Sequence, residues 1–183
     1  YSTKYVIPNV LNTYITTTLN YQIDLENNYD KSFTIERPFF SPYAKWAAGI
    51  YFDQQFKVSG LPDKNNVYAG QNFKFDTQDY WAGNAIRIFK GNSINERTTN
   101  LITTARLLKI KYREIPTIAY VSIGFFSDEN FSLFGIGISS RQYVEDRFLF
   151  NYRIIEDVPV GKAIGITGDY QKTNDVVRTY FGA

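Results

Sequence analysis

Residues 43–58, YAKWAAGIYFDQQFKV, decide the fold class of this chain. The even positions from Trp46 to Val58 are mostly apolar, whereas the odd positions include Lys45 and Asp53. An alternation of period two predicts a strand rather than a helix. The pattern lasts about sixteen residues, whereas an average globular strand has ~5–6 residues and a membrane-crossing strand needs ~9–11. We therefore expect a strand long enough to span a bilayer.

The same alternation recurs along the chain. It predicts strands at residues 130–141, 148–156 and 161–170, each with one apolar side. Less regular candidates are residues 14–25, 31–39, 72–89, 101–112, 118–126 and 176–183. The first twelve residues show the least pattern, so we expect a loop or an edge there.

Short polar segments separate these candidates, at residues 59–66, 91–95, 127–130, 143–147, 157–161 and 172–175. A parallel pair needs a crossover of about a dozen residues, so short connections predict antiparallel neighbours. We expect one all-β region over residues 1–183: an antiparallel transmembrane β-barrel or part of one.

The composition fits this expectation and excludes several function classes. Tyr and Phe number 15 each and are interleaved with polar residues, as in barrels with aromatic girdles. A soluble β-barrel or sandwich also alternates, so that reading stays open. The chain has no His and no Cys, which excludes imidazole catalysis and thiolate metal sites. A net charge of +2 gives no reason to expect a nucleic-acid partner.

Alternation also assigns faces to individual residues. The apolar side of each strand is expected to face lipid and the polar side a hydrated lumen. The two Trp residues are expected in interfacial girdles. The predicted lipid-facing residues are Trp46, Ile50, Phe52, Phe134, Ile136, Ile138, Phe148, Phe150, Ile164 and Ile166. The predicted lumen-facing residues are Lys45, Asp53, Arg141, Arg153 and Thr167.

We predict no catalytic residue, no metal site and no cofactor. Glu156 and Asp157 are adjacent in a strand pattern and would point to opposite faces, which argues against a catalytic pair. Asp76, Asp79 and Asp128 with Glu129 could offer oxygen ligands to calcium, but solvated charge is the favoured interpretation.

Residues 139–171, SSRQYVEDRFLFNYRIIEDVPVGKAIGITGDYQ, resemble a hairpin segment of bacterial surface-antigen barrels of the BamA/TamA-like superfamily. In that family an aromatic residue and Asp-Arg end one strand. An apolar strand, a Glu-Asp-(Ile/Val)-Pro-x-Gly segment and a Gly-rich strand follow. Asp169 departs from the usual second Gly of that last strand. The matching positions are Tyr143, Asp146, Arg147, Glu156, Asp157, Val158, Pro159, Gly161, Gly165, Thr167, Gly168 and Tyr170.

The resemblance implies a bacterial outer-membrane location and a role in outer-membrane protein assembly or translocation. Its implied partners are membrane lipid, lipopolysaccharide and client outer-membrane proteins. Family members have periplasmic POTRA domains and more strands, so we expect this chain to be an incomplete barrel, with those domains and the final strands elsewhere. Two other functions stay open. One is a soluble β-barrel or sandwich that binds a small apolar ligand, and the other is a barrel that anchors a separate enzyme domain.

Overall fold

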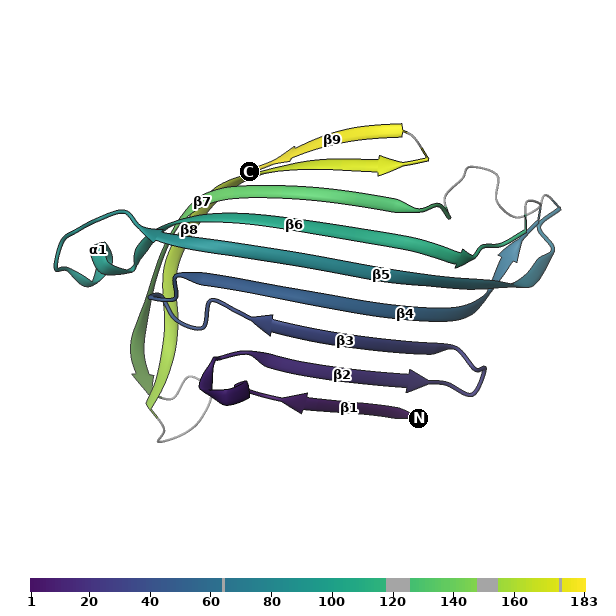
Figure 1. Ribbon diagram of the computed structural model, residues 1–183, viewed down its shortest axis with the longest axis horizontal. Helices are drawn as coiled ribbons and strands as arrows, with labels where there is room; N and C mark the ends of the chain where they lie inside the picture. The colour runs from purple at the N-terminus through teal and green to yellow at the C-terminus, as the bar shows by residue number, and fades with distance from the viewer. Residues whose placement is uncertain (64, 118–125, 148–154, 175) are drawn as a thin grey trace.

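The computed structural model describes residues 1–63, 65–117, 126–147, 155–174 and 176–183, with the backbone alone at 143, 145–147 and 155–159. The described strands form a single antiparallel sheet in which each strand pairs with its sequence neighbours (Figure 1). The predicted all-β antiparallel class is therefore confirmed. No helix among the described residues is long and apolar enough to cross a bilayer.

The elements in chain order have the following bounds. The strands are β1 (Ser2–Ile7), β2 (Thr16–Ile23), β3 (Tyr29–Arg37), β4 (Trp46–Pro62), β5 (Tyr68–Arg87), β6 (Thr99–Glu114), β7 (Glu129–Arg147), β8 (Ile155–Thr173) and β9 (Val176–Gly182). The 3-10 helix η1 (Val10–Asn12) connects β1 to β2, and the short helix α1 (Ile94–Thr98) connects β5 to β6.

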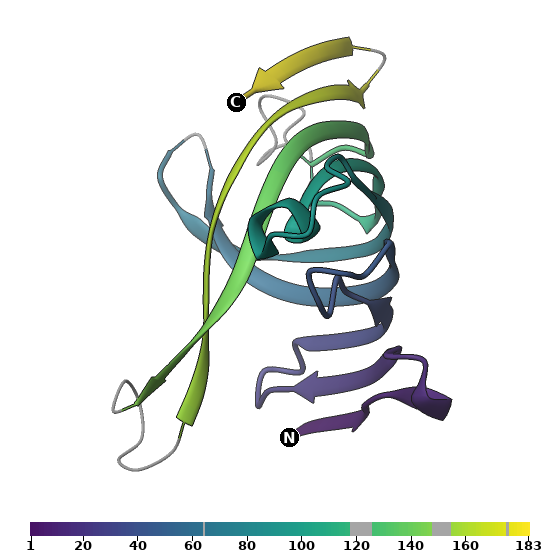
Figure 2. The same ribbon diagram turned by 90° about the vertical axis from the view of Figure 1, so that its left-hand side faces the viewer.

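The sheet is curved and open. Figure 2, an end-on view, shows the strands along an arc with β1 at one end and β9 at the other. Among the described strands, β1 pairs only with β2, and β9 pairs only with β8. The described residues therefore form a trough, and barrel closure stays a prediction.

Two predicted connections are wrong. Residues 2–7, where a loop or an edge was expected, form the edge strand β1, because pairing with β2 supplies their backbone hydrogen bonds. The connections predicted at 143–147 and 157–161 are instead paired with each other within one long hairpin. Pro159 is tolerated there because β9 pairs only with residues 167–173 of β8, so Pro159 lies where β8 has a single described neighbour. The predicted strand at 118–126 lies almost entirely outside the described residues.

Two hairpin turns at one end of the sheet share one construction. In the β2–β3 turn, the Asp24 carboxylate accepts hydrogen bonds from the amides of Glu26 at 2.8 Å and Asn28 at 2.9 Å. In the β4–β5 turn, Asp63 accepts from the amides of Asn65 at 2.7 Å and Val67 at 2.9 Å. The residue three positions after each Asp is an Asn with positive φ, 64° at position 27 and 60° at position 66. Asn tolerates this left-handed conformation better than most residues.

The β7–β8 hairpin depends on a close backbone approach. Gly137 lies opposite Gly165 in the register. A Cβ atom on Gly137 would lie 2.7 Å from the Ile164 carbonyl oxygen and 2.9 Å from the Gly165 Cα. Backbone atoms cannot move aside as a side chain can, so glycine at this position is a packing requirement.

The first prediction concerns the charge of the β2–β3 turn. The hydrogen bonds from Asn28 and Glu26 lower the pKa of Asp24 below its ordinary value of 3.8. A lowered folded-state pKa stabilises the fold above the unfolded pKa, and this stabilisation disappears as pH falls through the folded pKa. Asp24→Asn keeps an acceptor oxygen but cannot titrate. We expect the urea midpoints of wild type and Asp24→Asn to differ at neutral pH and to converge in acid. A constant difference across pH would contradict the assignment.

The second prediction concerns the glycine contact. Gly137→Val should destabilise the sheet by about 1–3 kcal/mol, because the new side chain overlaps the β8 backbone. Ser139→Val is the matched control, since position 139 lies on the same face of β7 and already carries a side chain. The free energy of unfolding from urea titration compares them. Equal losses for both variants would show that the close approach is not limiting.

Candidate functional site

The register divides the sheet into two faces of opposite chemistry. Residues paired across antiparallel strands share a face, and each strand alternates between the two faces. One face, called the polar face here, carries mainly small, hydroxyl, amide and charged side chains, together with a few apolar ones such as Leu108, Phe131 and Leu133. Its members include Thr18, Asn20, Ser32, Thr34, Ala47, Gly49, Asp53, Gln55, Thr77, Asp79, Thr104, Arg106, Gly135, Thr167 and Gln171.

The opposite face, called the apolar face here, carries aliphatic and aromatic side chains along the middle of the strands. Its members include Leu19, Phe33, Ile35, Ile50, Phe52, Tyr80, Ala105, Leu107, Phe134, Ile136, Ile138, Ile164, Ile166 and Phe181.

Burial is inverted relative to a water-soluble sheet. The polar face holds Asp53 at 5% and Asp79 at 6% exposure, whereas the apolar face exposes Phe134 at 62% and Ile166 at 61%. Soluble monomers rarely leave a contiguous apolar surface of this kind uncovered. The apolar face therefore requires an apolar neighbour, either lipid or another protein surface.

The polar face is organised by hydrogen bonds between its own side chains. Arg106 on β6 binds the Asp79 carboxylate of β5 through two nitrogens, with Nε at 2.9 Å from Oδ1. Asp53 accepts from the Gln55 amide at 2.6 Å. The Asp79 carboxylate is thus satisfied by Arg106, whereas Asp53 has one oxygen bonded to Gln55 and a buried Oδ1 with no hydrogen-bond partner among the described residues.

Aromatic rings pack together on the polar face near the β4–β5 turn. Phe73 packs on Phe126 with ring centroids 4.8 Å apart, and Phe75 packs on Tyr112 at 5.5 Å. The Tyr112 and Phe126 rings also meet at 6.1 Å. The sequence alone does not predict this cluster, because Phe126 comes from the β6–β7 connection and only the fold brings its ring against Phe73.

Most residues predicted to share a face do so. Trp46, Ile50, Phe52, Phe134, Ile136, Ile138, Ile164 and Ile166 all lie on the apolar face. Asp53, Arg141 and Thr167 all lie on the polar face. What each face contacts stays a prediction.

The other predicted face residues need separate statements. Lys45 precedes β4, and its carbonyl accepts a hydrogen bond from the Ala85 amide at 2.8 Å. Phe148, Phe150 and Arg153 lie outside the described residues. Trp81 lies on the polar face opposite Gly49, so the two tryptophans lie on opposite faces of the sheet and only Trp46 lies on the side predicted to face lipid. A Cβ on Gly49 would meet the Trp81 indole, so the glycine makes room for the ring.

The family-motif residues lie in the long β7–β8 hairpin. Tyr143 is opposite Pro159, Asp146 is opposite Glu156, and Arg147 is opposite Ile155. Asp157 is opposite Glu145, Gly161 is opposite Arg141, and Gly168 and Tyr170 continue along β8. The motif thus occupies two facing strand segments.

The acidic residues considered for calcium are not brought together. Asp76 lies on the apolar face and pairs with Arg113 at 2.6 Å, whereas Asp79 lies on the polar face with Arg106. The Asp128 carboxylate accepts from the Tyr112 amide at 2.8 Å. Each carboxylate therefore has a structural partner of its own.

The apolar face is staggered relative to the register. The apolar stretch of each strand is called the apolar band here. On β3 this band lies between Lys31 and Arg37 and is centred on residue 34. Following the paired residues from strand to strand, position 34 corresponds to Gln171 of β8. The apolar pair of β8, Ile164 and Ile166, is centred instead on residue 165. The apolar band has shifted by six residues over five strand steps.

The shift accumulates steadily across the sheet. On β6 the apolar residues centre on position 104, whereas the register from residue 34 of β3 leads to position 108, a shift of four residues. On β7 they centre on position 136, whereas the register leads to position 131, a shift of five residues. With ~3.3 Å per residue and ~4.8 Å between strands, six residues in five steps corresponds to a band inclined at roughly 40° to the hydrogen-bonding direction. If the apolar band lies parallel to a membrane plane, the strands have to be tilted from the membrane normal by the same angle.

Neither a protein-family model, nor a curated protein, nor a solved structure matches this chain significantly. The resemblance to surface-antigen barrels accordingly stays a prediction from the hairpin motif.

Proposed function

We propose that this chain forms part of the wall of a non-enzymatic outer-membrane β-barrel, with the apolar face against lipid and the polar face lining a hydrated lumen. The observation that carries the proposal is the inclined apolar band. Transmembrane barrel strands tilt by ~35–45° from the barrel axis. A level band of lipid contact on such strands has to cross the register obliquely, as this one does at roughly 40°.

The soluble alternative explains less. A barrel that holds an apolar ligand would place its apolar side chains in the concave interior. Here the crowded inner wall holds Asp53 and Asp79, and the apolar side chains are the exposed ones. A β-sandwich would need a second sheet on the apolar face. Packing of a second sheet does not explain why the apolar band shifts steadily along the strands from β3 to β8.

Within the membrane-barrel class, the hairpin motif favours the surface-antigen type, with outer-membrane protein assembly or translocation as its role and a bacterial outer membrane as its location. Such a role needs a hydrated interior and no catalytic group. The polar face, with its hydroxyl, amide and paired charged side chains, fits this requirement.

The two tryptophans test the lipid assignment directly, because Trp46 lies on the apolar face and Trp81 on the polar face. The probe is a vesicle whose phospholipids carry brominated acyl chains, which quench indole fluorescence on contact. The single-tryptophan variants are Trp81→Phe, which reports Trp46, and Trp46→Phe, which reports Trp81. We expect strong quenching of Trp46 and weak quenching of Trp81. Absence of Trp46 quenching would support the soluble alternative, and equal quenching would contradict the separation of faces.

A second prediction compares charge on the two faces. Ile136→Arg places a cation on the apolar face near the centre of the band and should destabilise the folded state in lipid by about 2–4 kcal/mol. Thr167→Arg introduces the same side chain on the polar face of the neighbouring strand and should cost much less. Reversible folding titrations in vesicles measure both. Equal penalties would contradict the membrane assignment.

A further inference from the structure

Lysines gather on one border of the apolar face. Beyond the apolar band, toward the β2–β3, β4–β5 and β8–β9 turns, this face changes from aliphatic to basic. The register places the lysines of β6 and β8 on the same face as Leu107 and Ile166. We call this group the basic collar; it comprises Lys31, Lys74, Lys109, Lys111 and Lys172.

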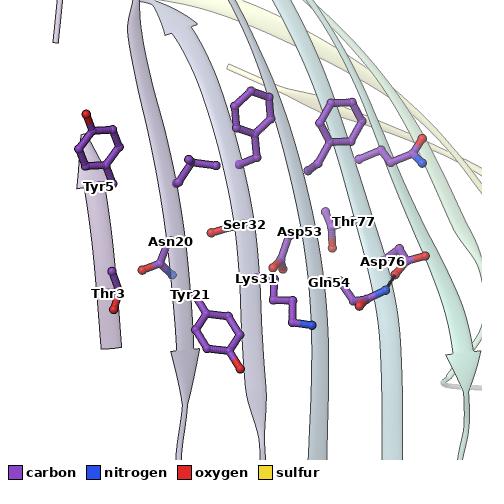
Figure 3. A pocket seen from close by; sticks show the side chains of 14 residues that line it. Thr3, Tyr5, Asn20, Tyr21, Lys31, Ser32, Asp53, Gln54, Asp76 and Thr77 are labelled. Atoms are coloured by element: carbon purple, nitrogen blue, oxygen red, sulfur yellow. Dashed lines mark hydrogen bonds between the residues drawn. The ribbon is translucent and has the colours of Figure 1, made fainter. Parts of the chain in front are cut away.

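The collar lysines project from several strands. Lys31, Lys109, Lys111 and Lys172 are exposed, and Lys74 is half-buried. In the register, Lys31 leads through Gln54 and Asp76 to Lys111 in a single row. Figure 3 shows the β3–β5 part of this row, with Lys31, Gln54 and Asp76 on successive strands beside Tyr21.

The acid within this row is already engaged. Asp76 accepts from the Gln54 amide at 3.0 Å and pairs with Arg113 at 2.6 Å. Glu114 lies opposite Lys74 beyond an irregularity in the β5–β6 register. Lys31, Lys109 and Lys111 therefore give this outward surface an excess of positive charge.

Aromatic rings accompany the charge. The Lys31 ammonium lies 4.6 Å from the Tyr29 ring centroid and 5.8 Å from that of Tyr21. Tyr29 is farther from the band centre than Lys31, so the lysine extends toward the outer border. Amphipathic rings beside long basic side chains are typical of the lipid headgroup level.

The backbone positions of Lys111 and Lys172 lie at headgroup level. With strands tilted by roughly 40°, each residue advances about 2.5 Å along the membrane normal. Lys111 lies seven residues from the band centre at 104, and Lys172 lies seven residues from the centre at 165. The Cα atoms of both are thus about 18 Å from the midplane, whereas half of the hydrocarbon core is ~15 Å. Lys109, five residues from 104, and Lys31, three residues from 34, lie about 13 Å and 8 Å from the midplane, so their side chains have to extend outward along the strand to reach the headgroups.

The opposite border is different. On the described strands it carries Arg37 and Lys162 on the apolar face. Arg37 is held by the structure itself: its guanidinium lies 3.9 Å from the Trp46 ring centroid, and its Nε donates to the Thr13 carbonyl at 3.2 Å. The charge on the apolar face is therefore concentrated at the border that carries the β2–β3 and β4–β5 turns.

We propose that the basic collar binds the phosphate groups of anionic lipids and so places the β2–β3, β4–β5 and β8–β9 turns at the anionic leaflet surface. This inference rests on the proposed membrane insertion and adds to it a lipid class and an orientation. Each lysine near an anionic membrane surface strengthens binding by about fivefold.

The test uses vesicle flotation with phosphatidylcholine alone and with phosphatidylcholine mixed with phosphatidylglycerol. The collar variant is Lys31→Gln, Lys109→Gln and Lys111→Gln together. The matched control is Lys4→Gln, Lys45→Gln and Lys57→Gln together, which removes the same charge from β1 and β4 of the polar face and from the residue before β4. Flotation gives the ratio of affinities for the two vesicles, and Trp46 quenching reports insertion separately.

We expect wild type and control to prefer the anionic vesicles, with a preference that weakens at high salt. The collar variant should lose roughly 10- to 100-fold of this preference while keeping its affinity for phosphatidylcholine. An unchanged preference in the collar variant, or an equal loss in the control, would overturn the collar assignment. Loss of Trp46 quenching in all vesicles would overturn the proposed insertion. The ratio of affinities from flotation would still show whether the collar lysines bind anionic lipid.

Discussion

Backbone pairing between neighbouring strands is the interaction on which the rest of this structure depends. The β7–β8 register runs through nineteen residue pairs, and the β4–β5 register runs through seventeen. Long registers hold the pleat in phase, so that every second side chain reaches the same face over the whole strand. The separation into a polar face and an apolar face is a direct consequence, because a slip of one residue would exchange the two faces.

The sequence was sufficient to predict the class and the sides of the strands. Alternation in residues 43–58 placed Trp46, Ile50 and Phe52 on one side of β4 and Asp53 on the other, as the register has them. It also correctly predicted a strand at residues 101–112, which lie within β6. These successes are physical: a period of two is a local property that needs no knowledge of the partner strand.

The errors lie where local chemistry and pairing disagree. Pro159 and Gly161 are ordinary turn residues, yet they continue β8 because their segment has β7 on one side and no described strand on the other. Residues 2–7 are not among these errors: a loop or an edge was expected there, and pairing with β2 makes them an edge strand. Trp81 lies on the polar face opposite Gly49, and this pairing cannot be read from the sequence without the strand register. The same is true of the inclined band, which exists only when several strands are aligned.

The two aspartate turns add local control at one end of the sheet. Asp24 and Asp63 each collect two backbone amides within a span of five residues, so the hairpins that they close are fixed without help from distant packing. The capping box of α1, in which Ser93 and Glu96 exchange hydrogen bonds, gives similar local order to the β5–β6 connection at the opposite end.

The incline of the apolar band also bears on how alignment errors would be corrected. A slip of two residues between neighbouring strands preserves the alternation of the faces, so the pleat alone cannot reject it. On strands inclined at roughly 40°, such a slip displaces one strand's apolar segment by about 5 Å along the membrane normal. In a bilayer, that step would draw polar side chains into hydrocarbon at one border and expose apolar ones at the other. The thickness of the bilayer would thereby favour the correct register over registers shifted by two residues.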